Sequence, residues 1–283
     1  MNRITNGLLG FTILLLASCT VPEIQLEQQA AANGFTQNKL TSNGFLLTVF
    51  KNKPICNNNQ LHVYLAGDGK PWLYSRQVAR NPTPDYSLTL ELMRSDKTSS
   101  LYLGRPCYHG EHDSEICHPL YWTHWRYSNT VVDAMKNALQ NLLEAYPDCR
   151  VTVIGYSGGG SLAMLLAPKL SMVQRVITLS GNLNVAAWAR LHGYSLLTGS
   201  LDPAVEPALP PTIQQIHLIG EDDENIPAEI VLPVLALQPD PVILRFPNVD
   251  HHCCWIEIWS EIVNHLETDI EFTHQSGIVE KHH

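Results

Sequence analysis

The sequence lacks any basic tract that would offset its acidic residues. Asp and Glu number 27 against 18 Lys and Arg, so the formal net charge is −9. Because phosphate backbones attract clusters of Lys and Arg, this composition argues against a nucleic-acid partner. The chain is also too poor in glycine and proline, with 17 and 18 among 283 residues, to be fibrous. At 45% hydrophobic residues it is too apolar to be disordered.

Long apolar runs are missing as well. The run over residues 8–17 is interrupted only by Gly10 and Thr12, and no later run is long enough to span a bilayer. Ten helical residues rise about 15 Å, roughly half of a hydrocarbon core of about 30 Å. Following Arg3, this run is therefore typical of a signal peptide and not of a membrane anchor.

The apolar run ends in Leu-Ala-Ser-Cys at residues 16–19, which resembles the lipobox of bacterial lipoproteins. The resemblance implies that residues 1–18 are cleaved and that Cys19 is acylated, which anchors the chain to a membrane. Thr20 stands where a retention signal often has Asp, which favours the outer membrane, facing the periplasm, over the inner. The alternative is an ordinary secretory signal with a chance cysteine. Residues 19–40 are interpreted as a lipidated tether, because they are rich in Gln, Asn and Ala without a sustained apolar period.

Six further cysteines follow Cys19, and an even number in an exported chain predicts disulfides. Six cysteines allow 15 pairings, and the sequence does not choose among them. Cys107 and Cys117 flank a polar loop and are the first pair we expect. Cys253 and Cys254 are adjacent, and we expect them to serve different purposes instead of bonding to each other. The remaining two are Cys56 and Cys149.

From residue 41, apolar runs alternate with helical patterns. Strands are expected over residues 45–50, 61–65, 100–103, 150–154, 176–179, 213–219 and 242–246, and helices over residues 85–93, 130–143, 161–166 and 256–266. This alternation predicts an α/β fold with a mostly parallel central sheet covered by helices on both faces. No linker or repeat interrupts it, so residues 41–270 are expected to form one domain, followed by a polar tail over residues 271–283.

The sequence G-Y-S-G-G at residues 155–159 lies between an expected strand and an expected helix. In this context G-x-S-x-G is typical of a nucleophile elbow, with Ser157 at its tip. The chain here resembles the α/β-hydrolase superfamily over about residues 45–268. Residues 181–203 are similar to a stretch of uncharacterised bacterial α/β-hydrolase lipoproteins, at the place of a lid or substrate-facing insertion.

The superfamily resemblance implies the chain order Ser, Asp, His for a catalytic triad. Asp223 lies in the sequence G-E-D-D-E-N-I-P at residues 220–227, which follows an expected strand, and Asp222 is the alternative acid. His251 follows the last expected strand, with His252 as the alternative base. A zinc site at residues 251–254 is disfavoured, because four consecutive residues cannot converge on one tetrahedral ion. No metal and no cofactor are expected.

An oxyanion hole needs two backbone donors. The resemblance implies the N–H of Gly158 and the N–H of Asp68, with Gly69 as the alternative to Asp68. An aspartate there would oppose an oxyanion unless its side chain points away or pairs with a cation such as Lys70. Residues 105–107 and 121–128 are interpreted as a structural loop that caps the site.

These residues predict a serine hydrolase of the cell envelope that cleaves an ester-type acyl bond of a small molecule through an acyl-enzyme intermediate. Two alternatives remain at this point. One is a surface-anchored binding protein that kept the fold without the activity, and the other is an acyltransferase that uses the same triad.

Overall fold

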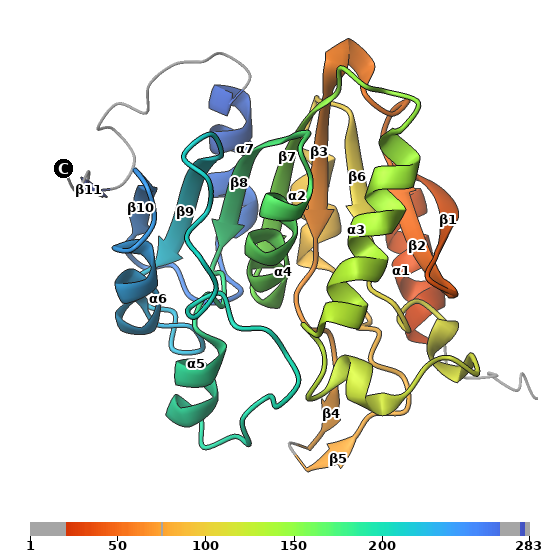
Figure 1. The fold of residues 1–283 in the computed structure, drawn as a ribbon, viewed down its shortest axis with the longest axis horizontal. Coiled ribbons are helices and arrows are strands. Elements are labelled where there is room, and N and C mark those ends of the chain that lie inside the picture. The colour runs from red at the N-terminus through yellow and green to blue at the C-terminus, as the bar shows by residue number, and fades with distance from the viewer. Residues whose placement is uncertain (1–20, 75, 267–277, 281–283) are drawn as a thin grey trace, which may run out of the picture.

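The computed structural model describes residues 21–74, 76–266 and 278–280, so Cys19 and the expected signal peptide lie outside it. Its centre is a sheet in the order β1-β2-β6-β3-β7-β8-β9-β10-β11 (Figure 1). The strands of this sheet are β1 (Thr36–Ser42), β2 (Phe45–Lys51), β3 (Gln60–Leu65), β6 (Ser100–Leu103), β7 (Arg150–Tyr156), β8 (Val173–Leu179), β9 (Gln214–Gly220), β10 (Val242–Phe246) and β11 (Ile278–Glu280). The neighbouring strands β6-β3-β7-β8-β9-β10 pair in parallel, whereas β1, β2 and β11 are antiparallel to their neighbours. The predicted mostly parallel sheet is confirmed.

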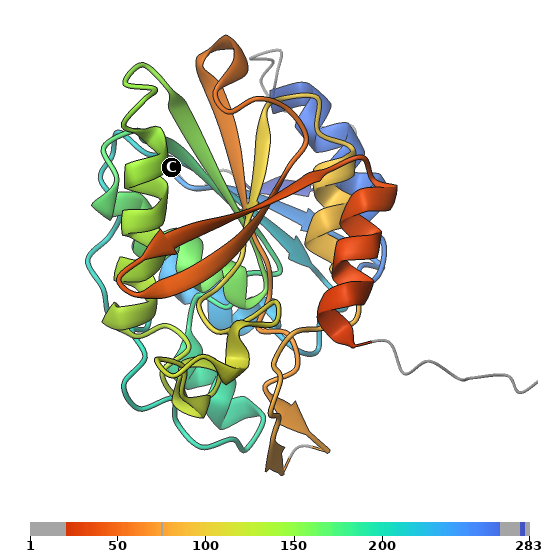
Figure 2. The same ribbon diagram turned by 90° about the vertical axis from the view of Figure 1, so that its right-hand side faces the viewer.

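Helices cover both faces of the sheet (Figure 2). The α-helices are α1 (Pro22–Ala32), α2 (Leu88–Arg94), α3 (Asn129–Leu143), α4 (Gly158–Leu166), α5 (Val185–Leu191), α6 (Ala228–Leu235) and α7 (Trp255–Leu266). Short 3₁₀ turns lie at Asn57–Asn59, Glu111–Asp113, Pro119–Trp122 and Ala167–Lys169, and β4 (Trp72–Leu73) pairs with β5 (Gln77–Val78) in a separate hairpin. Among the described residues, no helix is long and apolar enough to cross a bilayer.

The two faces carry separate apolar cores because side chains alternate along each strand. In β3, Leu61, Val63 and Leu65 pack into the core shared with α3, α4 and α6. Tyr64 points the other way, into the core shared with α1, α2 and α7. Burial on both faces explains why these central strands have the β-branched, near-continuous apolar sequences of a parallel sheet.

The expected tether over residues 19–40 is wrong where the structure describes it. Pro22–Ala32 is helix α1, and Thr36–Ser42 is the edge strand β1. Leu26 and Ala30 are one helical turn apart and fully buried, so a narrow apolar stripe fastens an otherwise polar helix to the sheet. The expected polar tail is also incomplete as a description, because Ile278–Glu280 adds to the sheet as β11.

Three disulfides join the six cysteines after Cys19. The predicted bond between Cys107 and Cys117 is present. Cys56 bonds to Cys149, 93 residues away in sequence. Cys253 and Cys254 bond to each other, so the expectation that these neighbours serve different purposes is wrong. Neither thiol of residues 253 and 254 is free to bind a metal.

Candidate active site

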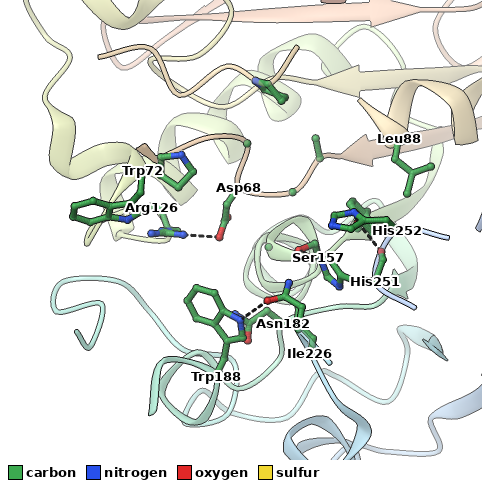
Figure 3. Close-up of a pocket in the computed structure, with 18 of the residues that line it drawn as sticks. Asp68, Trp72, Leu88, Arg126, Ser157, Asn182, Trp188, Ile226, His251 and His252 are labelled. Atoms are coloured by element: carbon green, nitrogen blue, oxygen red, sulfur yellow. Dashed lines mark hydrogen bonds and ion pairs between the residues drawn. The ribbon is translucent and has the colours of Figure 1, made fainter. Parts of the chain in front are cut away.

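Four loops meet at the carboxyl edge of the parallel strands, where α/β sheets place their ligand sites. Ser157 follows β7 directly, and Asp68 lies three residues after the end of β3. Asp223 lies three residues after the end of β9, and His251 five residues after the end of β10. Since these strands are parallel, their carboxyl ends bring the four residues to one edge of the sheet (Figure 1). Figure 3 shows three of them, Asp68, Ser157 and His251.

Ser157 lies in a sharp turn between β7 and α4. Its φ of 55° and ψ of −123° are unfavourable for a residue with a side chain. Two glycines make the turn sterically possible. A Cβ on Gly155 would lie 2.2 Å from the carbonyl oxygen of Gly159, and a Cβ on Gly158 would lie 2.1 Å from Oδ1 of Asp68. The structure therefore contains the strained strand–turn–helix that the sequence predicted around Ser157.

Ser157, His251 and Asp223 form a continuous chain of polar contacts. Nε2 of His251 is 3.0 Å from Oγ of Ser157, and its Nδ1 is 2.9 Å from Oδ2 of Asp223. The His251 side chain lies beside Ser157 in Figure 3. With Nδ1 bonded to a carboxylate, Nε2 is the nitrogen left to accept a proton from the hydroxyl. The alternatives Asp222 and His252 are both exposed and make neither contact.

The carboxylate of Asp223 is fixed by its own loop. Its Oδ1 accepts hydrogen bonds from the backbone N–H groups of Asn225 and Ile226, at 3.0 and 2.8 Å. Burial by itself would raise the pKa of this carboxyl group. The hydrogen bond and charge of His251 outweigh it and lower the pKa, so Asp223 is ionised at neutral pH. An ionised Asp223 stabilises a positive charge on the imidazole.

Tyr156, the variable residue before the serine, holds the histidine loop. Its hydroxyl donates to the carbonyl oxygen of His251 at 2.7 Å and lies 3.1 Å from Nδ1 of His252. The rings of Tyr156 and His251 also pack together, with centroids 5.3 Å apart. Sequence reasoning missed this role, since the motif leaves the residue between Gly155 and Ser157 unspecified.

The loop after β3 lies against the serine. A Cβ on Gly67 would be 3.3 Å from Cβ and 3.6 Å from Oγ of Ser157, so this loop lies against the serine side chain. Tyr108 donates from its hydroxyl to the carbonyl oxygen of Asp68 at 2.8 Å and fixes this loop from outside. Gly158 opens α4, so its N–H has no partner within the helix. The loop that carries the N–H of Asp68 and the helix start that carries the N–H of Gly158 therefore both lie beside Ser157.

The side chain of Asp68 is neutralised by two arginines. Nη1 of Arg126 lies 2.7 Å from Oδ2, and Nη1 of Arg105 lies 2.8 Å from Oδ1. The Tyr127 hydroxyl donates to the same carboxylate at 2.8 Å. Burial alone would raise the pKa of Asp68, but Arg126 and Arg105 lower it to about 2. Figure 3 shows the contact with Arg126.

The expectation that Lys70 pairs with Asp68 is wrong, because Lys70 pairs with Asp85 instead. Arg105 and Arg126 belong to the two segments that were interpreted as a capping loop. Their own charge was the only sequence signal for this role. Nothing in the sequence links them to Asp68, which is 58 residues from Arg126.

A cavity of about 890 Å³ opens over Ser157. Its apolar and aromatic lining includes Leu88, Ile256, Trp72, Trp188 and Tyr194. In Figure 3, Ser157 lies between Leu88 on one side and Trp72 and Trp188 on the other. The segment over residues 181–203, expected to be substrate-facing, supplies part of this wall through α5 and the loop after it. Within the described ranges, no three His, Cys, Asp or Glu residues are grouped to hold a metal.

Comparison with known proteins gives the fold. Residues 104–189, which include Ser157 and Gly158, match the family model described as Lipase (class 3). No curated protein matches the chain. An α/β serine hydrolase without lid from Xanthomonas campestris is 14% identical, with a TM-score of 0.54 over 85% of this chain and 97% of that one.

Two more structures agree in fold. Est1E from Butyrivibrio proteoclasticus is 15% identical, with a TM-score of 0.54 over 82% of this chain and 98% of that one. A membrane phospholipase A, described as a bacterial virulence factor, is 14% identical, with a TM-score of 0.54 over 87% and 89%. The predicted α/β-hydrolase fold is confirmed. The resemblance to bacterial lipoproteins stays a prediction.

Proposed function

We propose that this chain, which has the α/β-hydrolase fold, is a serine hydrolase that cleaves an ester-type acyl bond. The observation that carries the proposal is the hydrogen-bonded chain from Ser157 through His251 to Asp223, at the base of a large cavity. A serine hydroxyl is a weak nucleophile without a base, and an imidazole oriented by a carboxylate supplies one.

In the proposed reaction, Oγ of Ser157 attacks the acyl carbonyl while Nε2 of His251 accepts the hydroxyl proton. Asp223 holds the imidazole through Nδ1 and stabilises its positive charge. The N–H groups of Gly158 and Asp68 receive the oxyanion. His251 then gives its proton to the leaving alcohol, which separates and leaves an ester on Ser157. A water molecule then attacks the acyl carbon while Nε2 of His251 accepts its proton. The bond between that carbon and Oγ of Ser157 breaks, His251 returns the proton to Oγ, and the acid leaves.

The environment of Asp68 supports an active enzyme over a binding protein without activity. A free carboxylate beside the oxyanion would oppose the reaction, but two arginines offset this one. The proposed ester substrate is argued from similarity to known proteins. The class 3 lipase model and the esterase Est1E favour esters over amides.

The nucleophile is tested by labelling the purified protein with a fluorophosphonate probe. We expect wild-type protein to be labelled and Ser157→Ala to lose both labelling and ester hydrolysis, the latter by several orders of magnitude. Ser171→Ala is the matched control, since Ser171 is exposed and lies at the opposite end of the sheet. Labelling that persists in Ser157→Ala would refute the proposal.

The adjacent aspartates provide an internal comparison for the acid. Asp223→Asn should lower turnover by about 10⁴-fold, because the imidazole loses the partner that fixes its tautomer. Asp222→Asn should keep activity close to wild type, as Asp222 is exposed. Equal losses in the two variants would remove Asp223 from the proposed triad. Product analysis with and without an added alcohol separates hydrolysis from acyl transfer.

We also propose that Cys19 carries the lipid and holds the protein at the bacterial outer membrane, facing the periplasm. The support is the Leu-Ala-Ser-Cys sequence at the end of the apolar run. Metabolic labelling with a palmitate analogue should mark the wild-type protein and fail to mark Cys19→Ser. Label retained in Cys19→Ser, or wild-type protein recovered in the soluble periplasmic fraction, would contradict the anchor.

A further inference from the structure

Large apolar side chains are exposed around the mouth of the cavity. We call this group the rim, and it consists of Leu73, Tyr74, Tyr86, Leu191, Tyr194 and Leu196. Each is at least 40% exposed, and Tyr74 reaches 94%. Tyr86 and Tyr194 also line the cavity. Contiguous exposed apolar surface of this kind marks a binding surface for a protein or a membrane.

The segments that carry the rim contact one another. Trp72 in the β4–β5 hairpin packs edge-on against His124, with ring centroids 6.1 Å apart. Nδ1 of His124 lies 3.3 Å from the carbonyl oxygen of Leu196, and Trp188 packs on Tyr194 with centroids 5.3 Å apart. Figures 1 and 2 show the hairpin projecting from the same end of the molecule as α5. The hairpin and residues 188–197, which carry five of the six rim residues, are therefore linked beside the cavity.

The first described helix is hydrogen-bonded to the segment that joins the β4–β5 hairpin to α2. Nδ2 of Asn81 donates to Oε2 of Glu23 in α1 at 2.8 Å, and Gln29 exchanges two hydrogen bonds with the backbone of Ser87, each 2.9 Å long. Ser87 lines the cavity. In Figure 2 the start of α1, in red, is the end of this helix that is nearer to the hairpin.

Cys19 precedes Pro22, the first residue of α1, by three residues, so a lipid on Cys19 would be held within about 11 Å of the start of α1. That distance leaves no room for a long tether. The bilayer would pass close to the wall of the cavity, and Val21 and Ile24, both 43% exposed, would face it too.

Two of the three segments that carry the rim are basic, in contrast to the chain as a whole. Residues 72–78 and 188–197 contain Arg76 and Arg190 and no Asp or Glu, although the net charge is −9, and the third segment has Asp85 beside Tyr86. The nearby Lys70 and Arg80 are paired with Asp85 and Asp113. Aromatic residues with flanking arginines suit the interface of an anionic bilayer, where rings sit at headgroup depth and cations meet phosphates.

We propose that the rim docks on the lipid bilayer that carries the anchor, so that the cavity opens onto the membrane and takes an acyl-ester lipid from it. Arg76 and Arg190 would lie at the anionic headgroups. This inference rests on the proposed hydrolase function and on the proposed lipid at Cys19. A protein partner for the rim is the competing outcome of the test.

The test compares two variants of the lipidated protein, reconstituted in vesicles of phosphatidylethanolamine and phosphatidylglycerol. The rim variant is Leu73→Ser/Tyr74→Ser/Leu191→Ser, which changes no cavity-lining residue. The control is Val205→Ser/Leu237→Ser, which removes exposed apolar residues outside the rim. We expect the rim variant to hydrolyse vesicle lipid at least tenfold more slowly than wild type, the control to match wild type, and all three to hydrolyse a water-soluble short-chain ester equally.

A second measurement reports contact directly. In vesicles that contain brominated acyl chains, we expect the tryptophan emission of the wild-type protein to be quenched. The quenching should be weaker in Trp72→Phe, because Trp72 lies in the β4–β5 hairpin next to Leu73 and Tyr74. Wild-type rates on vesicle lipid in the rim variant, or no quenching in wild type, would overturn docking on the bilayer. Fluorophosphonate labelling without any hydrolysis of vesicle lipid would overturn the inference and leave the proposed function standing. Loss of labelling itself would remove the proposed function.

Discussion

Asp68 lies where an unpaired negative charge would oppose the proposed oxyanion, yet its ion pairs make it hold neighbouring loops together. Its carboxylate meets Arg105, Arg126 and the hydroxyl of Tyr127, and it occupies the space above Gly158 that a larger residue would need. The ion pairs join the β3 loop to two other loops. The acid thereby fixes the peptide whose N–H is proposed to receive the oxyanion.

This ion pairing makes a pH-dependent contribution to stability. The pKa of Asp68 falls from an ordinary value of 3.8 to about 2 in the folded protein, so folding favours the ionised form. The contribution is fully present above pH 4 and is lost as the pH falls through 2, a change of about 2 kcal/mol. We expect the difference in free energy of unfolding between wild type and Asp68→Asn to shrink by that amount between pH 4.5 and pH 2, measured by urea denaturation.

Asp148→Asn is the control for this measurement. Asp148 is exposed in the turn before β7, so its variant should track wild type across the same pH range. An Asp68→Asn difference that stays constant with pH would mean that the carboxylate gains nothing from its two arginines.

At the scale of elements, the disulfides differ in what they join. The bond between Cys56 and Cys149 connects the loop before β3 to the turn before β7, at the amino ends of the strands and away from the active-site edge. The bond between Cys107 and Cys117 closes a local loop of ten residues' separation. A cross-link restricts the unfolded chain more when it closes a longer loop.

Removing each bond should therefore cost a different amount of stability. We expect Cys56→Ser/Cys149→Ser to lower the free energy of unfolding by about 4.5 kcal/mol and Cys107→Ser/Cys117→Ser by about 3 kcal/mol. Guanidinium denaturation of both variants beside wild type measures the difference. A larger loss for the local loop would show that native contacts, and not loop length, set the contribution.

The elements also show which patterns sequence reasoning detects. Central strands and α3 have strong periodic signals, and their bounds fall within a few residues of expectation. Helix α1 was not expected because only Leu26 and Ala30 form its buried stripe. Helix α6 was not expected because it contains Pro233 and is apolar on most of its surface, so it lacks an amphipathic pattern. Helix α4 starts at Gly158, three residues earlier than expected, because three glycines mask a helix that the strained serine initiates.

Across the whole molecule, the sequence predicts those site residues whose place depends only on which strand they follow. Ser157, Asp223 and His251 each follow a recognisable strand, so the parallel topology brings them together. The arginines that hold Asp68 come from irregular loops, for which no periodicity or motif gives a direction. The bond between Cys253 and Cys254 is likewise a matter of loop geometry. Contacts of this kind depend on the finished tertiary structure.

The distances along the chain have a consequence for biogenesis. The serine and the histidine that lies 3.0 Å from it are 94 residues apart, and the histidine is contributed by one of the last loops. If the proposed signal peptide directs export of an unfolded polypeptide, Ser157 would have no histidine beside it during that passage. The proposed hydrolysis would then begin only after β10 has joined the sheet, outside the compartment in which the polypeptide is synthesised.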